Sequence, residues 1–247
     1  VEPGAIVIFD RSGMRSMRTH CGGNAHKCIF EYIYFARPDS RIDGISVHAA
    51  RLSAGRLLAQ QHPVAADLVF GVPDSGTDAA MGYSRFSGIP YGKGLVKNNY
   101  IGRTFIKPSQ QQRETSVRIK LNPIRSSVAG KRVVMVDDSI VRGTTSARIV
   151  HLIKAAGATE VHVRISSPPF LWPCYFGTDV PSLDELTARH HSIDEIRSLI
   201  GADSLGFLDP DSLGEMLGET GRHYCSACFS GQRSEEHTSE LQSPNTI

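Results

Sequence analysis

The chain has 247 residues, 40% of them hydrophobic and 21% charged, which is enough to bury one substantial core, with or without a small appendage. Its net charge is only +2, and the charges are spread along the sequence rather than gathered in the basic stripe typical of nucleic-acid binders. No apolar run approaches the roughly 20 residues that a membrane-spanning helix needs, and residues 1–4 do not resemble a signal peptide. We therefore expect a soluble cytoplasmic enzyme with no nucleic-acid or membrane partner.

The first half of the chain alternates between strand-like and helix-like segments. In chain order, the patterns predict a strand at 5–9, an irregular stretch to residue 24, a helix at 42–61, a buried strand at 68–72, a helix at 78–87 and a long loop at 97–112. The helix at 42–61 is indicated by apolar residues at helical spacing, and His62-Pro63 ends it. The run at 68–72 is short, apolar and bounded by turn residues, as is typical of a parallel strand buried on both faces.

The clearest unit lies between residues 132 and 165. The patterns there predict a strand at 132–136, a polar turn at 137–145, a helix at 146–156 and a strand at 161–165. This order implies a parallel pair of strands with a right-handed crossover. Two helices at 182–189 and 193–200 and a short cysteine-bearing segment at 224–231 follow. The predicted fold is α/β, with a central parallel sheet flanked by helices and a small C-terminal helical cap.

The turn of this unit carries the strongest functional signal. Asp137 and Asp138 stand at the carboxyl end of a buried strand, where open α/β sheets bind their ligands. A polar loop then enters a helix, whose unpaired N–H groups and dipole favour an anion, and Gly143 permits close approach of the backbone. Turn capping or helix capping alone would explain parts of this motif. Their combination favours a site in which the loop holds a terminal phosphate and the acids bind sugar hydroxyls or a divalent metal.

Two further segments are ambiguous when taken alone. The sequence Pro73-Asp74-Ser75-Gly76-Thr77 follows the strand at 68–72; it reads as an ordinary turn, although Ser75 offers a hydroxyl to a phosphate or to magnesium. The stretch from Lys97 to Gln110 reads as a solvated surface loop, but a loop of this length also suits a lid that excludes water from a reacting centre.

The cysteine pattern permits three interpretations. Cys225 and Cys228 form a C-x2-C pair, and the other three cysteines are scattered. The pair with two remote cysteines suits a structural zinc ion or an iron–sulfur cluster, whereas the third possibility is a set of unpaired buried thiols. Spacing alone does not choose between the two kinds of metal site.

Residues 133–146 resemble the phosphoribosylpyrophosphate (PRPP) motif of type I phosphoribosyltransferases. With the block from Phe30 to Ser40 (FEYIYFARPDS) and the stretch from Ile165 to Pro169, they make residues 1–231 similar to the amidophosphoribosyltransferases, or glutamine PRPP amidotransferases. The resemblance implies a type I phosphoribosyltransferase fold. It also implies the first committed step of purine synthesis, in which ammonia, supplied from glutamine in the complete enzyme, displaces pyrophosphate from C1 of PRPP to give 5-phosphoribosylamine.

The resemblance further implies roles for individual residues. Mg²⁺ would be held by Ser75, Asp137 and Asp138, and a flexible catalytic loop would contribute Lys97, Tyr100 and Arg103. The implied substrate-binding residues are Asp74, Ser75, Gly76, Thr77, Lys120, Asp137, Asp138, Ser139, Arg142, Gly143, Thr144, Thr145 and Ser146. A [4Fe–4S] cluster, as in the iron–sulfur branch of the family, would be held by Cys28, Cys174, Cys225 and Cys228, leaving Cys21 as a free thiol.

The same resemblance divides the chain into three parts. Residues 1–27 read as the end of a truncated glutaminase domain and a linker, 28–231 as the phosphoribosyltransferase domain, and 232–247 as an extraneous, disordered, adapter-like tail. We therefore expect no glutamine hydrolysis by this chain, and activity of the phosphoribosyltransferase part could require the missing half. The family implies a homotetramer that is inhibited by purine nucleotides.

Two alternatives share the PRPP motif. Another type I phosphoribosyltransferase would lack the four cluster cysteines. A non-catalytic PRPP-sensing regulator would carry a winged-helix or basic DNA-binding segment, and we find no such segment in the sequence.

Overall fold

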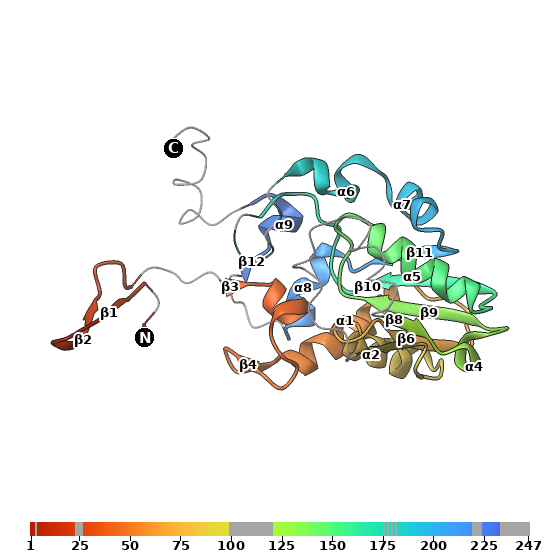
Figure 1. The fold of residues 1–247 in the computed structure, drawn as a ribbon, viewed down its shortest axis with the longest axis horizontal. Coiled ribbons are helices and arrows are strands. Elements are labelled where there is room, and N and C mark those ends of the chain that lie inside the picture. The colour runs from red at the N-terminus through yellow and green to blue at the C-terminus, as the bar shows by residue number, and fades with distance from the viewer. Residues whose placement is uncertain are drawn as a thin grey trace.

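The structure is a computed structural model that describes residues 1–2, 4–22, 27–98, 121–174, 176, 178, 180, 182–218 and 224–232. Its centre is a four-stranded sheet made of β6 (Leu68–Gly71), β9 (Arg132–Asp137), β10 (Glu160–Ile165) and β11 (Ser204–Phe207) (Figure 1). The strands lie in the order β11-β10-β9-β6, and every neighbouring pair is parallel. The prediction of an α/β fold with a central parallel sheet is confirmed.

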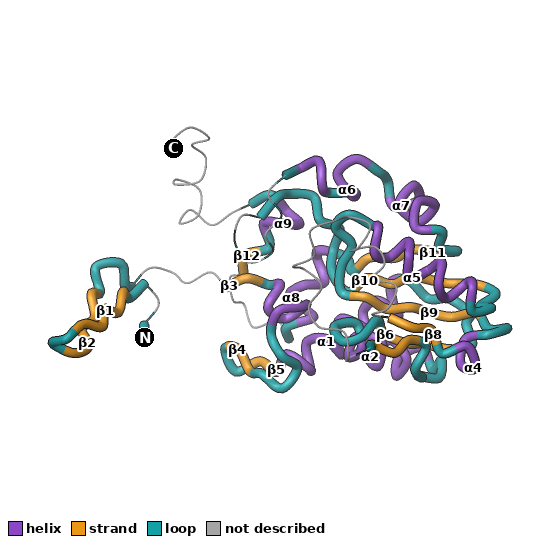
Figure 2. Tube along the Cα trace, in the orientation of Figure 1, coloured by secondary structure: helices purple, strands orange, loops and turns teal. Residues whose placement is uncertain are grey.

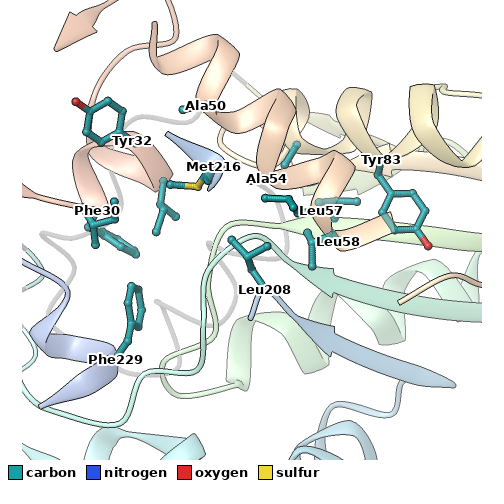
Figure 3. Close-up of a cluster of buried hydrophobic side chains, with 14 of the residues drawn as sticks. Phe30, Tyr32, Ala50, Ala54, Leu57, Leu58, Tyr83, Leu208, Met216 and Phe229 are labelled. Carbon is teal, nitrogen blue, oxygen red and sulfur yellow. The ribbon is translucent and has the colours of Figure 1, made fainter. Parts of the chain in front are cut away.

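Helices cover both faces of this sheet because alternate side chains of each strand point to opposite faces. On β9, Val134 and Val136 belong to one core, which also contains side chains from α1 (Val47–Gln61) and α2 (Thr77–Ser87) (Figure 3). The neighbouring residues Val133 and Met135 belong to a second core, which is completed by α5 (Thr144–Ala155) and α7 (Ile193–Ile200). The alternation therefore gives a three-layer arrangement of helix, sheet and helix.

Glycines bring α1 and α2 unusually close together. A Cβ atom on Gly55 would lie 1.8 Å from the carbonyl oxygen of Ala79, and one on Gly82 would lie 2.0 Å from that of Leu52. Any larger residue at either position would collide with the backbone of the other helix. This contact fixes α2, and with it the loop that precedes α2.

Smaller elements surround the central layers (Figure 2). The short strand pairs are β1 (Ile6–Asp10) with β2 (Gly13–Met17), β4 (Arg41–Ile42) with β5 (Ile45–Ser46), β7 (Leu95–Lys97) with β8 (Leu121–Pro123), and β3 (Lys27–Cys28) with β12 (Tyr224–Cys225). The short helices are η1 (Glu31–Phe35), α4 (Arg125–Val128), η3 (Leu183–Glu185), α6 (Thr187–His190), η4 (Pro210–Ser212), α8 (Leu213–Met216) and α9 (Ala227–Ser230). The hairpin of β1 and β2 lies away from the central sheet in Figure 1. The pairing of β3 with β12 joins the C-terminal segment to the start of the main body.

Three predicted elements need correction at their boundaries. The helix expected at 42–61 begins only at Val47, because the residues before it form β4 and β5 and because the Ser46 side chain caps α1 by accepting a hydrogen bond from the N–H of Ala49 (3.3 Å). The helix expected at 146–156 begins two residues early, at Thr144, directly after Gly143 with its φ of +74°. The single helix expected at 182–189 is wrong: the chain forms η3 and then α6, with Leu186 in an extended conformation between them.

Other elements were missed or lie beyond what the structure describes. The stretch to residue 24, expected to be irregular, contains β2, and the prediction did not include β11, the edge strand of the sheet. The tail at 233–247 and residues 99–112 of the predicted long loop lie outside the described residues. Among the residues that are described, no helix has the length and apolar character to cross a membrane.

Candidate functional site

The site lies where two strand-to-helix loops meet at one edge of the sheet. The loop at 72–76 joins β6 to α2, and the loop at 138–143 joins β9 to α5. Because β6 and β9 are parallel neighbours, their carboxyl ends lie side by side. A cavity of about 920 Å³ opens there, and its lining includes Asp74, Ser75, Lys97 and every residue from Asp137 to Ser146.

The two loops are joined at the Asp138 carboxylate. One of its oxygens, Oδ2, accepts a hydrogen bond of 2.5 Å from the Ser75 hydroxyl, and the other, Oδ1, accepts one of 2.5 Å from the Ser139 hydroxyl. The structure therefore brings together two of the three side chains expected to hold magnesium, although they are 63 residues apart in sequence. The third, Asp137, is adjacent, and its Oδ1 accepts a bond of 3.0 Å from the N–H of Asp138.

Asp137 is the most strongly perturbed acid of the site. Burial disfavours its charged form, and the neighbouring charge of Asp138 adds to this effect, so the pKa of Asp137 lies well above the usual range for a carboxyl. A pair of carboxyls that resist being ionised together is stabilised by a bound cation or by hydrogen-bond donors of a ligand. The donor set of two carboxyls and one hydroxyl, all oxygen, suits a hard divalent cation such as Mg²⁺.

The loop after β9 has the features of an anion site. Gly143 has a φ of +74°, which lets the chain turn directly into α5, and the helix then begins at Thr144. The backbone N–H groups of the first turn of this 12-residue helix lie at the cavity, as do the hydroxyl-bearing residues Thr144, Thr145 and Ser146. Arg142 adds a positive charge, and its Nη2 lies 2.6 Å from Oε2 of Glu185.

The loop after β6 is packed against β9. A Cβ atom on Gly76 would lie 2.3 Å from the carbonyl oxygen of Val136, which itself accepts a hydrogen bond of 2.8 Å from the N–H of Val72. Within this loop the Asp74 carboxylate pairs with the ammonium of Lys97 on β7. Of the four residues of this loop implied by resemblance, Asp74 and Ser75 line the cavity, whereas Gly76 and Thr77 do not. Thr77 begins α2, and Gly76 is the N-cap of that helix.

Arg51 is a cavity residue that the sequence reasoning missed. It lies on α1 and is only 4% exposed; its Nε donates to the carbonyl of Tyr32 (2.8 Å) and its Nη2 to the carbonyl of Ala36 (2.7 Å). Burial lowers the pKa of this guanidinium, while the carboxylates of Asp78 and Asp138 favour its charged form. The sequence feature that could have indicated Arg51 is the presence of an arginine on the buried face of a predicted helix.

The aromatic segment before Arg37 also faces the cavity. Phe30, Tyr34 and Phe35 line it, and the ring of Phe30 packs edge to face against that of Phe170 at 5.3 Å between centroids. These residues belong to the block that resembles the amidophosphoribosyltransferases, but the sequence assigned them no catalytic or binding role.

Tyr100, Arg103 and Lys120, for which the resemblance implied a catalytic or substrate-binding role, lie outside the described part of the chain.

The four cysteines proposed as cluster ligands converge at the junction of the N- and C-terminal segments. Cys28 and Cys225 are register partners of β3 and β12, and Cys228 follows in α9. Burial raises the pKa of the Cys28 and Cys228 thiols, and Cys174 and Cys225 add to both increases. Cys28 adds further to the increase at Cys228. No disulfide joins the described cysteines. In the part of the chain that the structure describes, no three or more His, Cys, Asp or Glu side chains are placed to hold one metal ion.

The parallel sheet, the paired acids and the phosphate-type loop together define the class of the protein. Residues 42–166 match the family model described as "Phosphoribosyl transferase domain", and the chain belongs to this family.

More specific similarity is to the amidophosphoribosyltransferases. The protein of that name from Bacillus subtilis is 55% identical over 239 residues, and the one from Archaeoglobus fulgidus is 53% identical over 234 residues. The matches cover 94% of this chain but 50% and 51% of those proteins, so the chain spans about half the length of the curated relatives it matches.

A solved structure shows the same similarity in three dimensions. The glutamine PRPP amidotransferase from B. subtilis, complexed with ADP and GMP, superposes with a TM-score of 0.80 at 55% sequence identity. The superposition covers 94% of this chain and 52% of that one. The fold at the candidate site is therefore shared with an enzyme whose name includes PRPP.

Proposed function

We propose that the chain is the phosphoribosyltransferase part of an amidophosphoribosyltransferase. In the proposed reaction, ammonia attacks C1 of PRPP, the bond from C1 to the pyrophosphate oxygen breaks, and 5-phosphoribosylamine forms. In a complete protein, glutamine would supply the ammonia. The observation that carries the proposal is the meeting of the two strand-to-helix loops at Asp138, in a chain of the phosphoribosyltransferase family that is 55% identical to a named amidophosphoribosyltransferase.

The two loops would divide the ligand between them. The loop after β9, with Arg142 and the first turn of α5, suits the 5-phosphate because N–H groups, hydroxyls and a guanidinium face the cavity together. Asp137 and Asp138 would accept hydrogen bonds from the ribose hydroxyls. The loop after β6 would hold the pyrophosphate, with the ammonium of Lys97 nearby. Anchoring both ends of the ligand orients C1, and this orientation contributes directly to the rate.

We also propose that Ser75, Asp137 and Asp138 hold Mg²⁺. The ion would neutralise charge that builds up on the departing pyrophosphate. Tyr100, Arg103 and Lys120 remain proposed contributors from the loop region, with Tyr100 and Arg103 acting beside Lys97 in a lid that excludes water from C1.

The reaction is tested by measuring pyrophosphate release from PRPP by the intact chain, with Mg²⁺ and ammonium and without oxygen. We expect ammonium-dependent release that is lost in Asp137→Asn and Asp138→Asn. Asp211→Asn, which removes an exposed carboxylate from η4, should retain it. PRPP binding without release would contradict the enzymatic proposal and support a PRPP-sensing role, whereas absence of both would overturn the assignment of the site.

We also propose that Cys28, Cys174, Cys225 and Cys228 hold a [4Fe–4S] cluster. The register pairing of Cys28 with Cys225 supports this, as does the increase that the other three thiols add to the pKa of Cys228, because iron–sulfur clusters are held by four cysteine thiolates. Such a cluster would fasten the C-terminal segment to β3. Iron and sulfide analysis of protein purified without oxygen should find both elements, with loss in Cys228→Ser and retention in Cys21→Ser.

We also propose that purine nucleotides inhibit this protein and that it assembles into an oligomer. The B. subtilis relative was solved with ADP and GMP, which supports purine nucleotides as inhibitors of this chain. We further propose a homotetramer, which light scattering on the purified chain would test directly.

A further inference from the structure

The Arg142–Glu185 ion pair places a carboxylate beside the proposed phosphate loop. Nη2 of Arg142 lies 2.6 Å from Oε2 of Glu185, and both residues line the cavity. Arg142 is the only basic residue between Asp137 and Ser146. Its guanidinium is thus already engaged by an anion that belongs to the protein.

The backbone around Glu185 is held firmly against this loop. Leu186, the next residue, is fully buried in the core that also contains side chains of α1, and the N–H of Thr187 donates to the carbonyl of Val141 (2.9 Å). The open side of Gly143 faces Thr187 and Ile200, whose nearest atoms would lie 3.7 Å and 3.8 Å from an added Cβ. The buried side chain of Leu186 and the hydrogen bond of Thr187 therefore fix the backbone of Glu185 next to Arg142.

We propose that Glu185 competes with the ligand phosphate for Arg142 and so limits how tightly the site holds a phosphate ester. This inference rests on the proposed role of the loop as a phosphate site. A phosphate monoester carries a charge of about −1.5 to −2 near neutral pH, so a fixed carboxylate next to its cationic partner opposes binding electrostatically. Weaker retention of the phosphate group favours release of a phosphorylated product.

If Glu185 only oriented Arg142, removing its charge would change the phosphate affinity in the opposite direction. If the carboxylate mainly held Arg142 in the geometry that receives phosphate, removing its charge would weaken binding. The sign of the change in affinity therefore decides between competition and orientation.

The experiment is a calorimetric titration of the full chain with ribose 5-phosphate at fixed ionic strength. Glu185→Gln keeps the size of the side chain and removes its charge, and we expect it to tighten binding by about fivefold, the scale of a partly exposed ion pair. Glu185→Ala, which also removes the charge, should tighten it as well. Asp184→Asn is the matched control, since it makes the same change in charge on the neighbouring exposed residue outside the cavity lining, and should leave the affinity within about twofold of the original.

A double-mutant cycle makes the test specific to the pair. Arg142→Met should weaken binding, and adding Glu185→Gln to Arg142→Met should produce no further tightening. Unchanged or weaker binding by Glu185→Gln, where Arg142→Met does weaken it, would overturn competition and leave the phosphate loop standing. Unchanged binding by Arg142→Met would overturn the phosphate role of Arg142 and this inference together, whatever the outcome of the pyrophosphate-release assay.

Discussion

The two loops of the site are shaped by different forces. In the loop after β6, the backbone is crowded: a Cβ on Gly76 would lie 2.3 Å from the carbonyl of Val136, and one on Gly71 would lie 2.5 Å from the backbone of Gly76. In the loop after β9, the nearest atom to a Cβ on Gly143 would be 3.7 Å away. The second loop takes its shape from the φ of +74° at Gly143 and from contacts with η3 and α6.

This difference separates a rigid half of the site from an adjustable one. The loop after β6 cannot shift without moving β9, so it holds Ser75 in a fixed position against Asp138. The loop after β9 is tied instead to the C-terminal segment, through Thr187 and Glu185, and a change in that segment changes the environment of Arg142. We therefore expect glycine substitutions to act mainly through stability in the first loop and mainly through phosphate binding in the second.

The largest effect is expected from Gly76→Ala. The added methyl group would collide with backbone rather than with a flexible side chain, so the free energy of unfolding should fall by about 2–3 kcal/mol. Urea denaturation followed by circular dichroism measures this change. Gly214→Ala is the control, because nothing lies within 4 Å of the added atom and the residue is helical. Equal stability of the two variants would show that the first loop is not held by crowding.

Intermediate effects are expected from Ser75→Ala and Ser139→Ala, which each remove one hydrogen bond to the Asp138 carboxylate. Each should lower the free energy of unfolding by about 1.5 kcal/mol, as for a hydrogen bond to a charged group. The two should differ in function: Ser75→Ala should raise the Mg²⁺ concentration needed for pyrophosphate release, and Ser139→Ala should not. An identical dependence on Mg²⁺ in both variants would remove Ser75 from the proposed metal site.

The smallest effect on stability is expected from Gly143→Ala. There is space for the methyl group, so the cost is only that of a left-handed backbone at a non-glycine residue, about 1 kcal/mol. Gly201→Ala at the end of α7 carries a similar strain, with φ at +71° and open space. Both variants should lose similar stability, but only Gly143→Ala should weaken ribose 5-phosphate binding in calorimetry. Weakened binding in both would mean that the second loop is not a separate determinant of affinity.

The sequence by itself determined the elements whose signal is local. The strands at 68–71, 132–137 and 160–165 were predictable because a strand buried on both faces must be apolar throughout. The helices at 77–87 and 193–200 were predictable because helical periodicity and clear ends coincide there. The paired acids and the phosphate-type loop were also visible, since their chemistry depends on adjacent residues.

Only the tertiary structure decided which of these pieces meet. The bond between Ser75 and Asp138 depends on the neighbouring positions of β6 and β9, and the position of Arg51 depends on how closely α1 packs beside the aromatic segment. The Arg142–Glu185 pair forms because the C-terminal segment returns to the loop after β9. Glu185 lies there in η3, which with α6 replaces the single helix predicted at 182–189. Contacts of this kind arise from the packing of distant segments, and no pattern within either segment encodes them, because each side chain alone is equally compatible with an exposed position.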